Sequence, residues 1–169
     1  AEMKNPLAFF DYVDSFRNHE INPEFTMLLS DANEQDLEQK VRQRSKEYPE
    51  VTCIWNEPAK PYFSTFDILL ITSHNESQPL VMLEALAHRV VPVGYAVGDL
   101  TEKYGLVFEP GRSIDEITSS IENIWSRPYE FSQSVDKKFH LVQENHTWEH
   151  IFSQYRRLMK TMINKEHCT

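Results

Sequence analysis

Two glutamates eight positions apart, Glu76 and Glu84, are the side chains whose type and spacing best suit a chemical role. Glu76 comes just before a predicted helix, and Glu84 lies inside that helix among apolar neighbours. A carboxylate in apolar surroundings is costly unless something pairs with it. Because an ionised carboxylate can accept two hydroxyl hydrogen bonds at once, sugar and ribose hydroxyls are suitable partners. The alternative is a pair of solvated glutamates, one in a loop and one on an exposed helix face.

The helix that contains Glu84 is predicted to begin at Pro79. Proline suits the first turn of a helix, because the N–H group that it lacks would have no partner there. Ser77 or Gln78 is then expected at the cap, and the open N–H groups of the helix end attract anions such as phosphate. Glu84 would lie about 7–8 Å further along the helix axis. A nucleotide diphosphate-sugar could therefore place its phosphates at the helix end, its sugar near Glu76 and its ribose near Glu84.

Short, continuous apolar runs alternate along the chain with segments of helical periodicity. The apolar runs predict strands at Phe25–Leu29, Val51–Trp55, Ile68–Thr72, Val90–Gly94 and Leu106–Phe108. Helices are predicted at Leu7–Phe16, Asn33–Tyr48, Pro79–His88, Ile114–Trp125, Tyr129–Asn145 and Trp148–Met162, with a turn or short helix at Pro61–Phe66. Ser113 and Glu116 have the spacing of a capping box. The alternation predicts an α/β fold with a doubly wound parallel sheet and helices on both faces, in which ligands bind beyond the carboxyl ends of the strands.

Composition limits the classes of function. The chain has 169 residues, enough for one domain with a sizeable core, and a formal net charge of −9. This charge argues against a nucleic-acid partner and against a basic face for anionic lipid. No apolar run approaches the roughly 20 residues of a membrane span, and no signal-peptide pattern is present. Cys53 and Cys168 are expected to be free thiols in a reducing, cytoplasmic setting, and core packing is expected for Trp55, Trp125 and Trp148.

Several motifs follow one another in a fixed order. The stretch 66–87 reads FDILLITSHNESQPLVMLEALA: a strand, a serine, a glutamate, Pro-Leu and then Leu-Glu-Ala. VVPV follows at 90–93, GDLTE at 98–102 and YGLVFEPG at 104–111, and HTW at 146–148 precedes a helix that contains YRRL. This order resembles the nucleotide-binding half of retaining glycosyltransferases of the GT-B fold, with family 4 the nearest match. The resemblance covers most of the chain and implies a Rossmann-like domain.

The resemblance implies roles for particular residues. Glu76 is placed at the catalytic centre, where it would contact hydroxyls of the donor sugar without acting as nucleophile, and Glu84 would bind the ribose. The implied donor-binding positions are Lys4, Ser77, Gln78, Pro79, Leu80 and Glu84. No Asp-x-Asp motif occurs, so we expect no metal and no other cofactor, with the leaving diphosphate held by the helix end and by Lys4.

The chain departs from the family pattern at its start. In the family a strand normally precedes the loop that corresponds to Lys4-Asn5-Pro6, and a partner arginine lies upstream. The amino-terminal half, which binds the acceptor, is also absent from residues 1–169. We therefore expect one donor-binding domain that does not transfer sugar efficiently alone. The complete enzyme would be a hexosyltransferase in polysaccharide biosynthesis with a glycan or lipid-linked acceptor, cytoplasmic or peripheral at the inner membrane face.

Two other functions remain open at this point. One is another nucleotide-sugar enzyme of the GT-B type, such as an epimerase, although the histidine and acid pattern of that class is not found. The other is a non-catalytic scaffold or interaction module with the same fold. The chain has only four glycines, and this favours the scaffold because tight phosphate-binding loops often need glycine.

Overall fold

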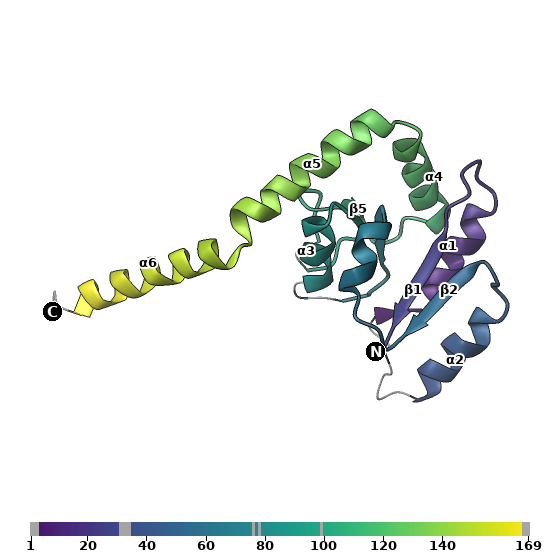
Figure 1. Cartoon of the computed structure of the whole chain (residues 1–169), viewed down its shortest axis with the longest axis horizontal. Coiled ribbons are helices and arrows are strands. Elements are labelled where there is room, and N and C mark those ends of the chain that lie inside the picture. The colour runs from purple at the N-terminus through teal and green to yellow at the C-terminus, as the bar shows by residue number, and fades with distance from the viewer. Residues whose placement is uncertain (1–3, 31–34, 76, 78, 99, 167–169) are drawn as a thin grey trace.

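Helices and strands occur in the order that the sequence predicts (Figure 1). A computed structural model describes residues 4–30, 35–75, 77, 79–98 and 100–166. Its strands are β1 (Phe25–Leu29), β2 (Val51–Trp55), β3 (Ile68–Ile71), β4 (Val91–Tyr95) and β5 (Leu106–Phe108). Its helices are α1 (Ala8–Phe16), α2 (Gln35–Ser45), the 3-10 helix η2 (Lys60–Thr65), α3 (Leu80–Ala87), α4 (Ile114–Trp125), α5 (Pro128–Asn145) and α6 (Trp148–Glu166).

All strand pairs in the described residues are parallel, as predicted from the continuous apolar runs. β1 pairs with β2, and β3, β4 and β5 follow one another in a second sheet. The sequence suggested one sheet, whereas the described strands form two. β1 and β3 are therefore edge strands, each with one side that pairs with no described strand.

Helices cover both faces of the three-stranded sheet. Ile68 and Leu70 of β3 pack against the cluster that contains side chains of α1 and α4. Ile71, which points the other way, packs with Met82 and Leu86 of α3. Successive β3 side chains point to opposite faces, as expected for a strand. Both faces are apolar because each one packs against helices, as the sequence predicts.

Some boundaries and burial predictions were wrong. α3 begins at Leu80, and Pro79 is its N-cap residue with an extended backbone (ψ 98°), so Ser77 does not hold the cap position. Gln78, the other residue expected there, lies outside the described residues. Two tryptophans predicted to lie in the core are exposed: Trp125 at 42% and Trp148 at 71%. Their helices were correctly predicted, but the faces that carry them have no covering element among the described residues. Trp55 is half-buried, with the Arg42 guanidinium 3.7 Å above its ring.

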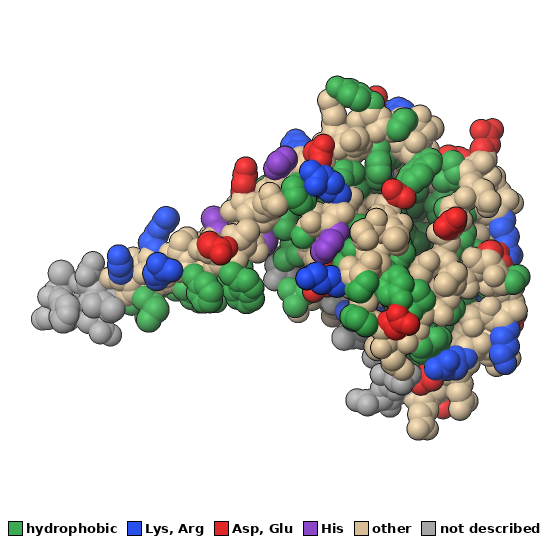
Figure 2. Space-filling view, viewed as in Figure 1, with side chains coloured by type: hydrophobic (Ala, Val, Ile, Leu, Met, Phe, Trp, Pro, Cys, Tyr) green, Lys and Arg blue, Asp and Glu red, His purple; other side chains and the backbone are tan. Residues whose placement is uncertain are grey.

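α6 projects away from the rest of the molecule (Figure 1), and hydrophobic side chains gather along one side of it (Figure 2). We call this side the apolar face of α6; its large exposed members are Trp148, Phe152, Tyr155, Leu158, Met159 and Met162. Basic residues, among them Arg156, Arg157 and Lys160, lie on the same helix. Within the described part of the chain, no helix has both the length and the apolar character needed to cross a bilayer.

A network of polar side chains joins α1 to α4. The Ser15 hydroxyl lies 2.6 Å from an Asp115 carboxylate oxygen and 2.7 Å from the Thr118 hydroxyl. His19 Nε2 lies 3.0 Å from the same Thr118 hydroxyl, and His19 Nδ1 lies 2.6 Å from a Glu122 carboxylate oxygen. The other Glu122 oxygen accepts two main-chain N–H groups just before β1. Thr118 is fully buried, so this network closes the interface between the helices and offers no route for a substrate.

Candidate functional site

The carboxyl end of β3 brings the start of the chain and the start of α3 to one place. The Thr72 hydroxyl, one residue past β3, donates a hydrogen bond to the Lys4 main-chain carbonyl at 2.9 Å. Ser73 follows and is buried, and α3 begins seven residues later at Leu80. Lys4 is thus anchored through its backbone at the edge of the sheet where ligands of parallel α/β folds bind.

Among the described residues, no side chain caps the amino end of α3. Its N-cap residue is Pro79, which makes no side-chain capping hydrogen bond. The first N–H groups of a helix have no partner within the helix and carry its positive end. α4 is the contrast, because Ser113 and Glu116 form the predicted capping box there and occupy those groups. Of these two helix ends, the one at α3 is left to accept an anion.

Leu80 and Glu84 are both exposed on the same short helix. Leu80 is 65% exposed at the start of this otherwise apolar helix. Glu84 is exposed one turn later, about 6 Å along the axis, and its carboxylate makes no hydrogen bond or ion pair within the described residues. An apolar side chain beside a helix end and an unpaired carboxylate one turn away form a surface that can contact both the apolar and the hydroxyl parts of a ligand.

The predicted site residues are only partly described. Glu76 and Gln78 lie outside the described residues, so the predicted convergence of Glu76 with Glu84 stays a prediction. Ser77 is exposed in the turn before α3, and Pro79 is buried. Sequence reasoning missed Thr72, although a hydroxyl residue directly after an apolar strand was a usable signal. Its partner, 68 residues away, could not be read from the sequence.

Lys138 of α5 supports the loop between β4 and β5, close to the start of β5. Its ammonium group donates hydrogen bonds to the main-chain carbonyls of Glu102 at 2.8 Å and Gly105 at 3.3 Å. Burial lowers the pKa of the Lys138 ammonium, and the neighbouring Lys137 charge adds to this effect. Lys138 therefore acts as a support for this loop, since its donors are directed to the protein backbone. In the described residues, no three acidic, histidine or cysteine side chains come close enough to hold a metal ion.

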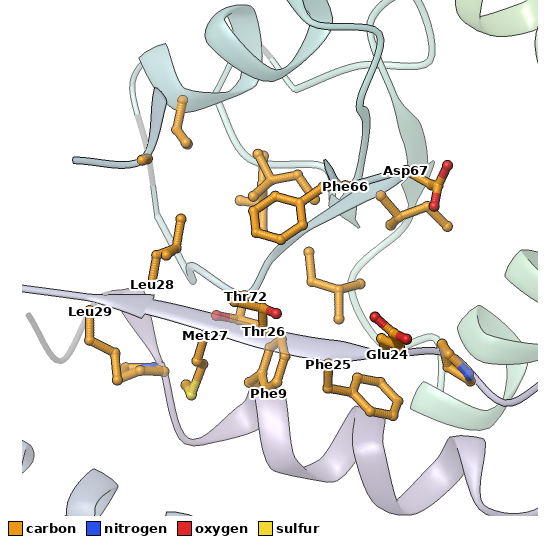
Figure 3. A pocket seen from close by; sticks show the side chains of 18 of the residues that line it. Phe9, Glu24, Phe25, Thr26, Met27, Leu28, Leu29, Phe66, Asp67 and Thr72 are labelled. Atoms are coloured by element: carbon orange, nitrogen blue, oxygen red, sulfur yellow. The ribbon is translucent and has the colours of Figure 1, made fainter. Parts of the chain in front are cut away.

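The larger described cavity adjoins this site. It measures about 750 Å³ and lies between β1 and β3 (Figure 3). Lys4 and Ser73 line it, as does Val81 of α3, but Leu80 and Glu84 are not among its lining residues. Leu80 and Glu84 therefore lie on the surface next to this cavity and outside its lining.

Comparison with known proteins identifies relatives of this fold. The family model described as glycosyl transferases group 1 matches residues 3–127. Among solved structures, HepE from Anabaena in complex with UDP-glucose is similar with a TM-score of 0.78 at 17% identity, over 95% of this chain and 46% of HepE. Sucrose-phosphate synthase from Thermosynechococcus elongatus gives 0.76 at 19% identity, over 98% of this chain and 44% of the synthase. A glycosyltransferase from Rickettsia africae gives 0.75 at 15% identity, over 96% of this chain and 45% of that enzyme.

The chain spans less than half the length of these solved structures. At such identities the likeness establishes the fold, and it confirms the Rossmann-like α/β half that the sequence predicts. No curated protein matches the chain.

Proposed function

Because this chain belongs to the group 1 glycosyl transferases, we propose that it is the donor-binding half of an enzyme that transfers a sugar from a nucleotide-diphosphate sugar to an acceptor. The observation that carries this proposal is the uncapped amino end of α3 at the carboxyl edge of the parallel strands. Leu80 lies exposed at that end and Glu84 lies unpaired one turn along. Family membership is the basis for the proposed reaction class, and this surface is the proposed binding site for the donor.

In the proposed complex each part of the donor meets a matching part of the surface. The diphosphate lies at the α3 amino end, where main-chain N–H groups and the helix dipole stabilise negative charge. That charge grows as the sugar leaves, so the same groups stabilise the transition state more than the ground state. Lys4 adds a positive side chain from the neighbouring loop. Glu84 accepts hydrogen bonds from ribose hydroxyls, and Glu76 does the same for the sugar.

The proposal extends to the whole enzyme. Residues 1–169 form a single donor-binding domain, and a second domain outside them binds a glycan or lipid-linked acceptor. Transfer is of a hexose with retention of configuration and without a metal, in the cytoplasm or at the inner membrane face. The isolated half binds donor but transfers little sugar, since the acceptor site is elsewhere. HepE is solved with UDP and with UDP-glucose, which makes these the first ligands to test on this chain.

Binding is tested by titrating the ¹⁵N-labelled chain with UDP, GDP and UDP-glucose while recording amide shifts. We expect saturable shifts that are largest from Leu80 to Glu84. Glu84→Gln should weaken binding about 10- to 100-fold, because a hydrogen bond to a charged group contributes roughly 1.5–3 kcal/mol. Glu144→Gln is the matched control: Glu144 is an exposed glutamate of α5 and should leave the affinity unchanged.

Each outcome separates the proposed function from its alternatives. No binding of any nucleotide at millimolar concentration would refute donor binding and favour the scaffold. Equal weakening by Glu84→Gln and Glu144→Gln would show that only overall charge matters. Binding of UMP as tightly as UDP would remove the role assigned to the helix end, because the second phosphate would then contribute nothing.

A further inference from the structure

The Lys138 side chain of α5 faces three main-chain carbonyls of one turn, which we call the 102–105 turn. Its ammonium nitrogen lies 2.8 Å from the carbonyl oxygen of Glu102, 3.3 Å from that of Gly105 and 3.5 Å from that of Lys103. Carbonyl dipoles that converge on one point repel one another unless a cation lies there, and hydrogen bonds to a charged donor are stronger than neutral ones. The ammonium group therefore keeps this turn compact.

The cost of burying this ammonium group indicates a specific role. Lys138 lines a cavity of about 130 Å³ between the sheet, α4 and α5, beside apolar residues such as Val93, Leu106 and Phe131. A charge in such surroundings is unfavourable unless it is hydrogen-bonded. An apolar side chain would pack there at a lower cost, so the hydrogen bonds to the 102–105 turn are what offset the burial of the charge.

The 102–105 turn has little room to move. Gly105 is buried, and a Cβ atom at this position would lie 2.6 Å from the Pro92 carbonyl oxygen of β4 and 3.0 Å from Leu100 Cδ1. The main chain of the turn is therefore packed directly against β4 and Leu100. Because protein interiors are close-packed, a shift of the turn would displace these neighbours.

Leu100 and Tyr104 connect the turn to α3. Both are buried in one cluster with Met82 and Leu86, two of the buried residues of α3. Met82 lies in the first turn of this helix, whose N–H groups form the proposed diphosphate site. The position of Leu100 limits the positions open to Met82, so the amino end of α3 is coupled to the turn through apolar packing.

The loop that contains the turn also begins beside the proposed donor site. Gly94, near the end of β4, is the register partner of Ile71 at the end of β3. The chain therefore leaves β4 at the carboxyl edge of the sheet, next to the segment that leads from β3 into α3. Val97, early in this loop, packs against the same buried cluster as Leu100. β4 thus anchors the start of the loop, and Lys138 holds its end.

We propose that Lys138 is a positioning residue for the donor site, which sets the amino end of α3 by holding the 102–105 turn against it. The ammonium group acts through main-chain carbonyls and does not touch the donor. This role rests on the proposed function, since the α3 end is the part of the chain expected to bind the diphosphate. Groups that bind a ligand must be held within about 0.5 Å of their productive positions, and contacts from behind the site provide this precision.

The test compares three single variants of the 169-residue chain. Lys138→Met keeps an unbranched apolar side chain and removes the charge and the donors, whereas Lys138→Arg keeps both. Lys137→Met is the matched control, because Lys137 is the neighbouring lysine of α5 and is exposed. Amide spectra of the nucleotide-free ¹⁵N-labelled proteins report on α3, and titration with UDP measures the affinity.

We expect Lys138→Met to shift the amide signals of Val81, Met82 and Leu83 in the nucleotide-free chain and to weaken UDP binding roughly 3- to 30-fold. Lys138→Arg should recover most of the affinity, and Lys137→Met should match the parent chain in both measurements. If Lys138→Met does not fold, Lys138→Gln takes its place. A glutamine amide keeps two donors without the charge, so the same changes should be smaller.

Three results would overturn the positioning role. Amide changes confined to residues 101–106, with the parent's affinity for UDP, would leave Lys138 a local support of its loop. Equal weakening by Lys137→Met would show that only net charge matters, and an Arg variant as weak as the Met variant would show that the ammonium charge does not. A parent chain that binds no UDP would refute the donor site, whereas the α3 signals of the nucleotide-free variants would still decide whether Lys138 positions α3.

Discussion

Replacing Thr118 by valine removes the central hydroxyl of the network between α1 and α4 and keeps nearly the same side-chain shape. That hydroxyl lies 2.7 Å from the Ser15 hydroxyl and 3.0 Å from His19 Nε2. It also lies 3.1 Å from the main-chain carbonyl of Ile114, so one proton and two lone pairs serve several neighbours. Valine can neither donate to nor accept from any of these groups, and Thr118 is fully buried, so water cannot replace the hydroxyl.

The expected cost follows from the groups left without a partner. Leaving a buried donor or acceptor unsatisfied costs about 1–3 kcal/mol. Ser15 keeps its hydrogen bond to Asp115, so His19 Nε2 is the group that loses its partner. We therefore expect Thr118→Val to lower the free energy of unfolding by about 1–3 kcal/mol. For a chain of this size this corresponds to a fall in melting temperature of roughly 2–12 °C.

Urea unfolding monitored by circular dichroism measures this loss, with Ser120→Ala as the matched control on α4. Among the described residues the Ser120 hydroxyl bonds only the Glu116 carbonyl of its own helix, at 2.8 Å, so its removal should change stability by less than about 0.5 kcal/mol. A Thr118→Val protein as stable as the parent would refute the reasoning. It would mean that the network exchanges its hydrogen bonds for others at no net cost.

Two further predictions concern the stability of α4 and α3. The hydrogen bond from His19 lowers the pKa of the Glu122 carboxyl, so the stability that this bond contributes is present above the ordinary carboxyl pKa of about 4.3 and is lost as pH falls through the lower folded value. Glu122→Gln should flatten this acid limb of melting temperature against pH, and an unchanged limb would show that other carboxyls control it. Leu86 lies on the buried side of α3 and is fully buried, and Leu86→Ala should cost about 2–5 kcal/mol in urea unfolding. A cost below 1 kcal/mol would mean that α3 is held mainly from its exposed side.

The order of elements was predictable because each apolar run has its own local pattern. β1 and β3 read as buried strands from their composition alone, and the Ser113–Glu116 capping box was visible as a four-residue motif. Long-range details were not predictable. The bond from Thr72 to Lys4 joins residues 68 positions apart, and nothing local specifies it.

Other misses have their own physical reasons. Pro79 was expected inside the helix, but its extended ψ makes it the cap, and proline is compatible with both positions. Trp148 was assigned to the core from its residue type, whereas its exposure depends on what lies beside α6. Of the two carboxylates predicted to bind the donor, Glu84 is exposed on α3, as in the solvated alternative given for it, and Glu76 lies outside the described residues.

The projection of α6 changes how this molecule would behave in solution. A helix of 19 residues is about 28 Å long, whereas a globule of 169 residues has a radius of gyration of only about 15–16 Å. Mass placed so far along one direction makes the particle markedly anisotropic. Small-angle scattering and sedimentation would therefore report an elongated object, and tumbling rates would differ between axes even when the sheets and their covering helices are rigid.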